Sequence, residues 1–252
     1  MTLEEGIELA QKGDVGAAIS VGNYYWDKKD PVEAYDYYVI AAKQGASYGI
    51  MMAMYCASIL VNADLLLNDT QAAIVHCQEG MHWASLVLTD KGDSVFSQKD
   101  KQAAADHYDV NVFDGGYSYY LLDNYQEAFN FSEKALDKQL PDIRLLRGVC
   151  LFNIAKTIDD NREAFDCLTS VFHPDNKNKE SSISPLIAEA AFCLSIIYRN
   201  GLPGRFAANT EKALETLINV RNFISNETHK DALAKEINKY HQKLFGGYVY
   251  KG

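Results

Sequence analysis

The sequence predicts an all-α protein, and three observations support that fold class. Apolar residues recur at spacings of three and four along nearly the whole chain, which is typical of helices with one buried face. Runs that alternate apolar and polar residues between turn formers, as strands do, are almost absent. Residues that favour helix starts and residues that favour helix ends also occur in matched pairs.

The first helix starts can be assigned from capping residues. Thr2 and Glu5 have the spacing of a capping box, in which the Thr2 hydroxyl accepts a hydrogen bond from a backbone N–H and the Glu5 side chain reaches back. This helix is expected to stop near Gly13, because glycine follows its last apolar residues. Asp14 then caps a second helix.

The remaining helices follow by the same rules. Pro31 opens a third helix at its first turn, where a missing N–H costs nothing, and Gly45 ends it. Further helices are expected at 47–64, 69–88, 99–122 with a break near Gly115, 125–138, 142–158, 160–172, 185–200, 209–224 and 227–245. About twelve helices would form six hairpins. The polar stretches 89–100 and 173–182 are expected to be surface loops between repeats rather than domain boundaries.

Composition and charge limit the functional classes. The 252 residues are 48% apolar and 23% charged, which is typical of a folded globular chain. The 24 Lys and Arg against 34 Asp and Glu give a net charge of −10, spread along the chain without a basic block, so no nucleic-acid partner is expected. No apolar run approaches the roughly 18 residues of a membrane span, and the N-terminus is acidic where a signal peptide is basic. A cytoplasmic location without membrane contact is therefore expected.

Five cysteines lie 17 or more positions apart and form no C-x-x-C pair. Their odd number and wide spacing suit neither a disulfide framework nor a zinc site. We expect each to be a small buried apolar residue, and we expect no cofactor. They are Cys56, Cys77, Cys150, Cys167 and Cys193.

A pattern of small and aromatic residues repeats along the chain. Its first copy has Ala17, Val21, Gly22 and Tyr25 in one helix, then Ala34, Tyr37, Tyr38, Ala41, Ala42 and Gly45 in the next. Ala190, Leu194, Ser195, Tyr198 and Gly201 reproduce the first half, and Gly116, Tyr119, Ala128, Ala135 and Pro141 form another copy. Small residues let two helices approach closely, while Tyr and Leu fill the gaps alongside. Because one hairpin cannot bury its apolar face alone, the pattern predicts stacked hairpins.

These residues resemble the Sel-one-like repeat family and its close relative, the tetratricopeptide repeat. Residues 10–45 match the Sel-one-like pattern, and Gly116 to Pro141 is closer to a tetratricopeptide unit. The resemblance covers most of the chain, although Met54 and Ser195 stand where the pattern has a small glycine. It implies one right-handed α-solenoid over residues 1–252. We expect a helical C-terminal cap at 227–245 and a tail at 246–252.

The resemblance also implies a non-catalytic scaffold whose concave wall is lined by the first helix of each hairpin. Aromatic side chains there would supply large contact area at low entropy cost for a peptide or helix of a partner protein. The candidate contact residues are Asn23, Trp26, Tyr48, Met51, Tyr55, Phe113, Tyr117, Tyr120, Phe152 and Arg199, with Leu145 and Phe192 beside them. The alternative interpretation is that these aromatic side chains pack between repeats.

No catalytic or metal centre is predicted. His76 and His82 lie about 120° apart around a helix, and no acidic residue is expected beside them. Asp106, Asp109 and Asp114 lack the spacing of a calcium loop and are expected to form a solvated face and a helix end. The segment 201–204 lacks the Lys-Ser/Thr of a phosphate loop and is interpreted as a turn between helices.

The aromatic C-terminal tail has two interpretations. It is expected to fold back and cap the apolar end of the solenoid, since terminal repeats must be shielded from water. The alternative is that it docks as an edge strand on a partner or on a second copy of the chain, which would make a homodimer.

The function predicted from the sequence is therefore a non-catalytic protein-interaction scaffold. Its acidic net charge favours a basic or aromatic peptide over an acidic one. Two alternatives stay open. One is a peptide-sensing regulatory protein whose output comes from a partner. The other is a hydrolase, which requires a nucleophile, a base and an orienting group in one pocket.

Overall fold

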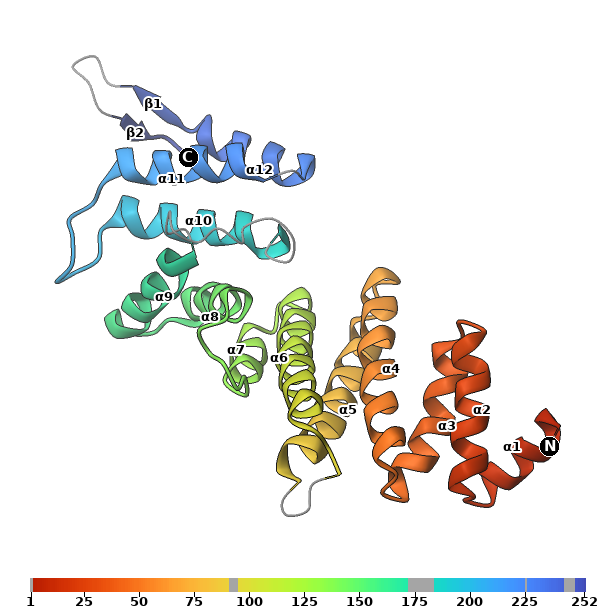
Figure 1. Ribbon diagram of the computed structural model, residues 1–252. Helices are drawn as coiled ribbons and strands as arrows, with labels where there is room; N and C mark the ends of the chain where they lie inside the picture. Colours follow the sequence, from red (N-terminus) through yellow and green to blue (C-terminus); the bar gives the residue numbers. More distant parts are fainter. Residues whose placement is uncertain (1, 91–94, 172–183, 225, 243–247) are drawn as a thin grey trace. The chain divides into compact units, whose positions relative to one another are not determined.

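A computed structural model describes residues 2–90, 95–171, 184–224, 226–242 and 248–252, and these residues are mostly helical, with only two short strands among them (Figure 1). The all-α prediction is confirmed for them. The first helices are α1 (Leu3–Gln11), α2 (Val15–Asp27), α3 (Pro31–Lys43), α4 (Ser47–Leu66), α5 (Thr70–Thr89), α6 (Gln98–Leu121) and α7 (Tyr125–Ser132). They are followed by α8 (Pro141–Ile154), α9 (Ile158–Val171), α10 (Ser184–Asn200), α11 (Thr210–Phe223), α12 (Glu227–Ile237) and the strands β1 (Tyr240–Gln242) and β2 (Tyr248–Tyr250).

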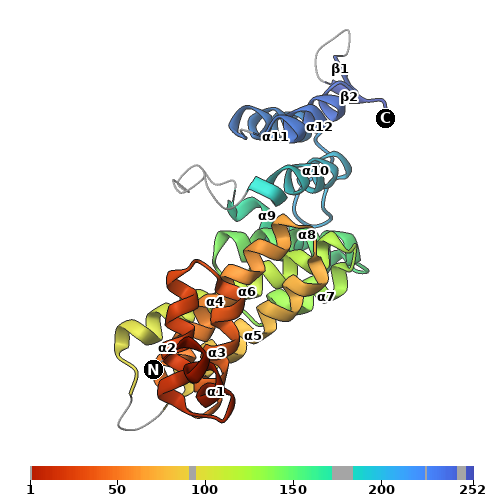
Figure 2. The same ribbon diagram turned by 90° about the vertical axis from the view of Figure 1, so that its right-hand side faces the viewer.

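Contacts between elements divide the chain into two compact units, Met1–Asp137 and Lys138–Gly252. In the first unit each helix packs against the next one along the chain, and α4 also contacts α6 (Figures 1 and 2). In the second unit α10 packs against α8, α9, α11 and α12, and β2 contacts α11. The prediction of one repeat domain over residues 1–252 concerns how the two units combine, and it stays a prediction.

The predicted helix starts of the first unit are confirmed. The Thr2 hydroxyl accepts from the Glu5 N–H at 3.2 Å, and the Thr2 N–H donates to the Glu5 carboxylate at 2.8 Å. The Asp14 carboxylate accepts from the Ala17 N–H at 2.7 Å, and Pro31 occupies the first turn of α3. Each cap satisfies N–H groups that have no partner within their own helix.

The predicted break near Gly115 is wrong, because α6 is continuous from Gln98 to Leu121. Gly115 instead allows α7 to pack closely on α6. A Cβ atom added at this position would lie 2.5 Å from an atom of the Phe131 ring, which is 2% exposed. The glycine is therefore a contact point between two helices and not a helix end.

The predicted helix at 125–138 is too long, since α7 ends at Ser132. Asp109 of α6 accepts hydrogen bonds from the backbone N–H groups of Leu136 (2.7 Å) and Asp137 (3.1 Å). These two N–H groups thus find their acceptor on another helix. Asp109 is 7% exposed, so its assignment to a solvated acidic face is wrong, whereas Asp106 is exposed as expected.

The predicted helical cap at 227–245 is also too long, because α12 ends at Ile237 and Tyr240 begins a strand. β1 pairs antiparallel with β2, with Tyr240 opposite Tyr250. The Tyr250 ring lies 5.1 Å from the Tyr240 ring and 3.7 Å from Cζ of Arg199 on α10. The described part of the tail therefore packs on its own unit (Figure 2). Residues 243–247, like 91–94 and 173–182 of the predicted loops, lie outside the described residues.

Small residues bring the helices of the first unit into close contact, as the repeated pattern predicts. A Cβ added at Gly22 would lie 2.7 Å from the Tyr38 ring, and one added at Gly49 would lie 2.8 Å from the backbone nitrogen of Ala42. Tyr38 is fully buried in a core cluster that includes Met54 of α4 and side chains of α5. This cluster fixes α3 and α5 on α4.

The expectation that no apolar run is long enough to span a membrane is wrong. α4 meets the criteria of length and composition, with a mean hydropathy of 1.6 over its most apolar window. Half of that window is buried within the protein, where α4 packs against α3, α5 and α6. A core helix meets the same criteria, and the burial of α4 agrees with that role.

The five cysteines are buried free thiols, as expected. Burial raises the pKa of the Cys56 and Cys150 thiols to about 12. These thiols are therefore protonated at neutral pH and behave as apolar side chains.

Candidate functional site

The described part of the first unit contains a groove between α3 and α5, with a volume of about 840 Å³. This volume falls within the range of about 300–1,000 Å³ that is usual for ligand sites. We call it the α3/α5 groove. It is lined by Tyr35, Asp36, Val39, Ala42, Lys43, Val75, Gln78, Glu79, His82, Trp83 and Leu86.

The floor of the α3/α5 groove is a chain of hydrogen bonds. Trp83 Nε1 donates to the Tyr35 hydroxyl at 3.2 Å, and the Tyr35 hydroxyl donates to Glu79 Oε2 at 2.9 Å. Tyr35 is 8% exposed and Trp83 is 6% exposed. Burial is the main cause that raises the pKa of Tyr35 far above its usual range, while the hydrogen bond from Trp83 lowers it. Tyr35 therefore stays neutral and keeps its proton for the bond to Glu79.

The spacing of residues along α3 and α5 determines which side chains form the two walls of the groove. Tyr35, Val39 and Lys43 are four residues apart on α3, so they share one face of that helix. Val75 and Glu79 have the same spacing on α5. Val75 is 46% exposed and Leu86 is 38% exposed, so the groove presents apolar surface to solvent above a buried floor.

The charge of the chain is divided unevenly between the units. Residues 1–137 contain 8 Lys and no Arg against 21 Asp and Glu, a net charge of −13, whereas residues 138–252 contain 16 Lys and Arg against 13 Asp and Glu, a net charge of +3. The expectation of an evenly spread charge is therefore wrong. Within the described residues, Glu79 forms no ion pair with a Lys or Arg side chain.

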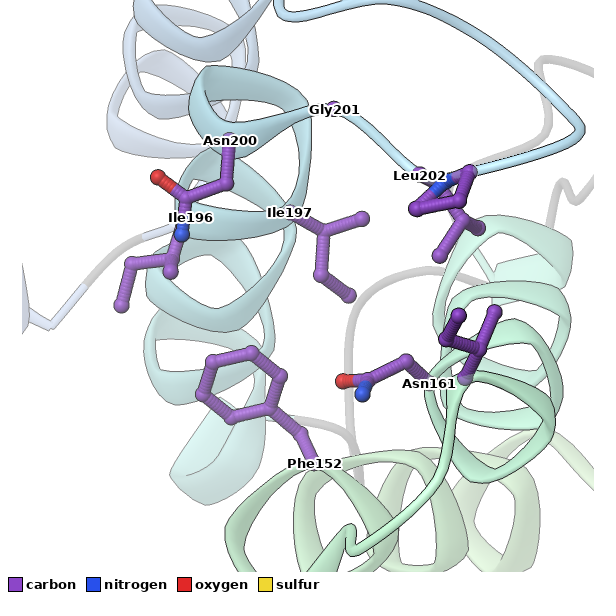
Figure 3. Close-up of a pocket in the computed structure, with 9 residues that line it drawn as sticks. Phe152, Asn161, Ile196, Ile197, Asn200, Gly201 and Leu202 are labelled. Carbon is purple, nitrogen blue, oxygen red and sulfur yellow. The ribbon is translucent and has the colours of Figure 1, made fainter.

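A smaller hollow of about 190 Å³ lies in the second unit, where the end of α8, the start of α9 and the end of α10 meet (Figure 3). Figure 3 shows Phe152 and Ile197 on its sides, with the Asn161 carboxamide pointing toward them. The hollow is below the usual size of a ligand site. It is lined by Phe152, Ile158, Asn161, Ile196, Ile197, Asn200, Gly201, Leu202 and Pro203.

The predicted wall residues of the first unit lie on three connected helices. The Tyr48 hydroxyl of α4 donates to Asn23 Oδ1 of α2 at 3.0 Å, and the Tyr38 hydroxyl donates to the same oxygen at 2.8 Å. The Tyr55 ring of α4 contacts the His107 ring of α6, with 4.7 Å between the centroids. The structure therefore links predicted residues of α2 and α4, with Asn23 as the acceptor, and it places Tyr55 against His107 of α6, which was not a predicted wall residue.

The aromatic side chains of this wall also pack against other parts of the unit. Trp26, Met51 and Tyr55 are half-buried against the core cluster of α3, α4 and α5. On α6, Tyr117 stacks on Phe113 at 6.0 Å and on Tyr120 at 5.9 Å between ring centroids. Burial raises the pKa of Tyr117. Such packing agrees with the alternative interpretation, in which these aromatic side chains pack between repeats. A role of these residues in binding a partner stays a prediction.

The predicted wall residues of the second unit have different surroundings. Phe152 lines the hollow in Figure 3. Arg199 instead lies over the Tyr250 ring and 3.7 Å from the Glu236 carboxylate. Leu145 is 1% exposed and belongs to the core, so its assignment to the wall is wrong, while Phe192 is half-buried.

The motifs considered for catalysis have structural partners. His76 Nδ1 lies 2.6 Å from Asp64 Oδ2, so the expectation that no acidic residue stands beside His76 is wrong. Asp64 comes from α4, and local spacing on α5 could not reveal it. Across the described ranges, no three His, Cys, Asp or Glu side chains converge as a metal-binding group. The segment 201–204 is a turn, as predicted, closed by a bridge between Leu202 and Phe206.

Comparisons with protein-family models, curated proteins and solved structures gave no match. The likeness to Sel-one-like and tetratricopeptide repeats thus stays a prediction from the residues. The candidate sites are defined by their geometry and charge.

Proposed function

We propose that the chain is a non-catalytic, cytoplasmic protein-interaction module that binds a segment of a partner protein. In this proposal the hairpins form a right-handed solenoid of about six repeats, of the Sel-one-like and tetratricopeptide kind. The observation that carries the proposal is the open α3/α5 groove, with exposed apolar walls above a buried floor.

The groove has the physical properties of a peptide-binding surface. A partner segment that covers Val75 and Leu86 would remove apolar surface from water, which stabilises a complex by on the order of 1 kcal/mol for each half-exposed side chain. The Trp83–Tyr35–Glu79 hydrogen bonds hold the floor in place, so binding orders few side chains. A groove between helices that rest on a third helix suits an amphipathic helix or an extended peptide.

The wall formed by α2, α4 and α6 is the alternative location for the same function. Tyr48 is 47% exposed there, and Tyr117 and Tyr120 are half-buried. The experiment that tests the proposal must therefore separate this wall from the groove.

The test is a peptide-display selection on the purified protein, followed by affinity measurements on three variants that are first shown to fold. The groove variant carries Val75→Gln and Leu86→Gln, which remove apolar surface without adding charge. The control variant carries Val32→Gln and Val110→Gln, two exposed valines outside the groove (59% and 49% exposed). The wall variant carries Tyr117→Ala and Tyr120→Ala.

We expect enriched peptides to bind the parent and the control equally and the groove variant about tenfold more weakly. Loss of binding only in the wall variant would overturn the groove as the site and assign the function to the predicted wall. A selection that enriches no peptide would overturn the proposed function.

A further inference from the structure

We propose that the segment bound in the α3/α5 groove is basic, and that one of its Arg or Lys side chains pairs with Glu79 while apolar neighbours cover Val75 and Leu86. This inference rests on the proposed function, because it names the chemistry of the groove's occupant. Three observations support it: the unused hydrogen-bond acceptor capacity of the Glu79 carboxylate, the order of charged side chains along the groove, and the net charge of the first unit.

Glu79 is a half-buried carboxylate whose acceptor capacity is only partly used by the protein. Its Oε2 accepts one hydrogen bond, from the Tyr35 hydroxyl, which holds the carboxylate in a defined orientation. No Lys or Arg among the described residues pairs with it. A carboxylate accepts more than one hydrogen bond, and a guanidinium or ammonium group is its strongest donor.

The charges of the groove are ordered along α3. Asp36 adjoins Tyr35 in the sequence, and both line the groove with Glu79, so one end of the groove carries two carboxylates. Lys43 lies seven residues further along α3, which is about 10 Å at the rise of an α-helix. The cation of a bound segment is therefore expected at the Asp36 end, away from Lys43.

The whole first unit favours the same sign of partner. Its net charge of −13 and its lack of Arg create a negative potential around the groove. Such a potential raises the association rate of a basic segment and discriminates against an acidic one. The aliphatic stem of a Lys or Arg can lie along apolar surface such as Val39 or Val75 while its charged end reaches a carboxylate.

The experiment uses the full chain and peptides enriched from a random display library. One enriched peptide that carries Arg is synthesised in two forms, one with this Arg and one with citrulline in its place, which is uncharged and similar in shape. The affinities of both peptides are measured for the parent, for Glu79→Gln and for Glu8→Gln. Gln at position 79 keeps an oxygen that accepts from Tyr35, and Glu8 is an exposed carboxylate of α1 outside the groove.

We expect most enriched peptides to contain Arg or Lys next to apolar residues. Glu79→Gln should weaken binding of the basic peptide by about tenfold, or about 1.4 kcal/mol, and Glu8→Gln should leave it unchanged. The citrulline peptide should bind the parent as weakly as the basic peptide binds Glu79→Gln. Combining both changes should then add little, because each removes the same interaction.

Two results would overturn the inference and leave the proposed function intact. One is a set of groove-binding peptides without basic residues, and the other is equal affinity of the basic peptide for the parent and Glu79→Gln. A tenfold loss with Glu8→Gln as well would also overturn it, since the effect would come from net charge and not from the groove. A selection without any enriched peptide would overturn both proposals.

Discussion

The two units of the chain link their helices by different polar contacts. In the first unit, hydroxyl, indole and amide groups join the helices, as in the bond from Trp83 to Tyr35 and the bond from Tyr38 to Asn23. In the second unit, arginine side chains join them: Arg147 of α8 lies 2.7 Å from Glu163 of α9, and Arg205 pairs with Asp166. All six Arg of the chain lie in the second unit.

This difference affects both stability and binding. Ion pairs near the surface each contribute about 0–1 kcal/mol and weaken in salt, whereas a buried polar group left without its partner costs about 1–3 kcal/mol. Apart from the contact between His76 and Asp64, the described helices of the first unit are therefore joined by buried or half-buried polar contacts that salt screens little. Its carboxylate Glu79 is not used in an internal ion pair, and in our proposals that carboxylate serves a partner.

The largest expected effect comes from Asp109, whose carboxylate accepts from two backbone N–H groups of residues 136 and 137. Asp109→Ala should lower the free energy of unfolding of the first unit by about 2–4 kcal/mol, because both N–H groups lose their acceptor. Urea unfolding measures the loss, and hydrogen exchange should show faster exchange in residues 133–137. The loss should be independent of salt concentration.

Asp106→Ala is the matched control for this change. Asp106 lies three residues earlier on the same helix, is exposed, and accepts a hydrogen bond from the Gln102 side chain at 2.9 Å. It should change the free energy of unfolding by less than about 0.5 kcal/mol. Equal losses in the two variants would contradict the role assigned to the buried carboxylate.

A smaller effect is expected in the second unit when residues 248–252 are deleted. The deletion removes the Tyr250 ring from Arg199 and from Tyr240, and it removes the strand β2. A cation–π contact and an aromatic pair each contribute about 1 kcal/mol, so the melting temperature of this unit should fall by several degrees. Thermal unfolding followed by circular dichroism measures the change.

Tyr250→Phe is the control for the deletion, because it keeps the ring over Arg199 and removes only the hydroxyl, whose bond from Lys239 Nζ is long at 3.4 Å, so it should melt closer to the parent than the deletion does. An unchanged melting temperature after the deletion, together with a changed oligomeric state by light scattering, would favour the alternative in which the tail docks on a second molecule.

Local signals in the sequence were sufficient for the helix starts and for the all-α class. The Thr2 and Asp14 caps act within three residues, so the sequence contains the whole interaction. The errors at helix ends have a different cause. α7 ends early because of Asp109, which lies 27 positions before the N–H of Leu136, and such a contact exists only after the helices pack.

The α3/α5 groove was missed for the same reason. Its floor joins Tyr35 to Glu79 and Trp83, which lie 44 and 48 positions further along the chain. The groove is formed by the second helices of the predicted hairpins, whereas the resemblance predicts a binding wall on the first helices. One signal was available in the sequence. Counting charges in each half of the chain, instead of over its whole length, would have shown the acidic first unit without Arg.

The smallest expected effect is a pH dependence of the first unit caused by His107. Burial between α4 and α6 lowers the pKa of His107, although Asp106 acts in the opposite direction. Its Nδ1 lies 3.0 Å from the Ser58 hydroxyl, and Tyr55 covers the ring from the side. The neutral ring is therefore the form that the folded unit accommodates.

The lowered pKa of His107 determines how stability changes with pH. A histidine in the unfolded chain has a pKa of about 6.5, so below that pH the unfolded state binds the proton more readily than the folded state. The free energy of unfolding should therefore fall as the pH drops from about 6.5 toward the lower pKa of the folded state. One titrating group can lower it by at most about 1.4 kcal/mol for each pH unit in that interval.

His107→Gln should remove this part of the pH dependence, since glutamine does not titrate. Urea unfolding of the parent and the variant at about pH 7.5 and about pH 5.5 measures it. His82→Gln, at an exposed position of α5, serves as the matched control for the loss of one histidine. If the His107→Gln variant loses as much stability on acidification as the parent, His107 is not the titrating group. The acid sensitivity of the first unit would then arise from its other titratable groups, which include His76 beside Asp64 and the 21 Asp and Glu.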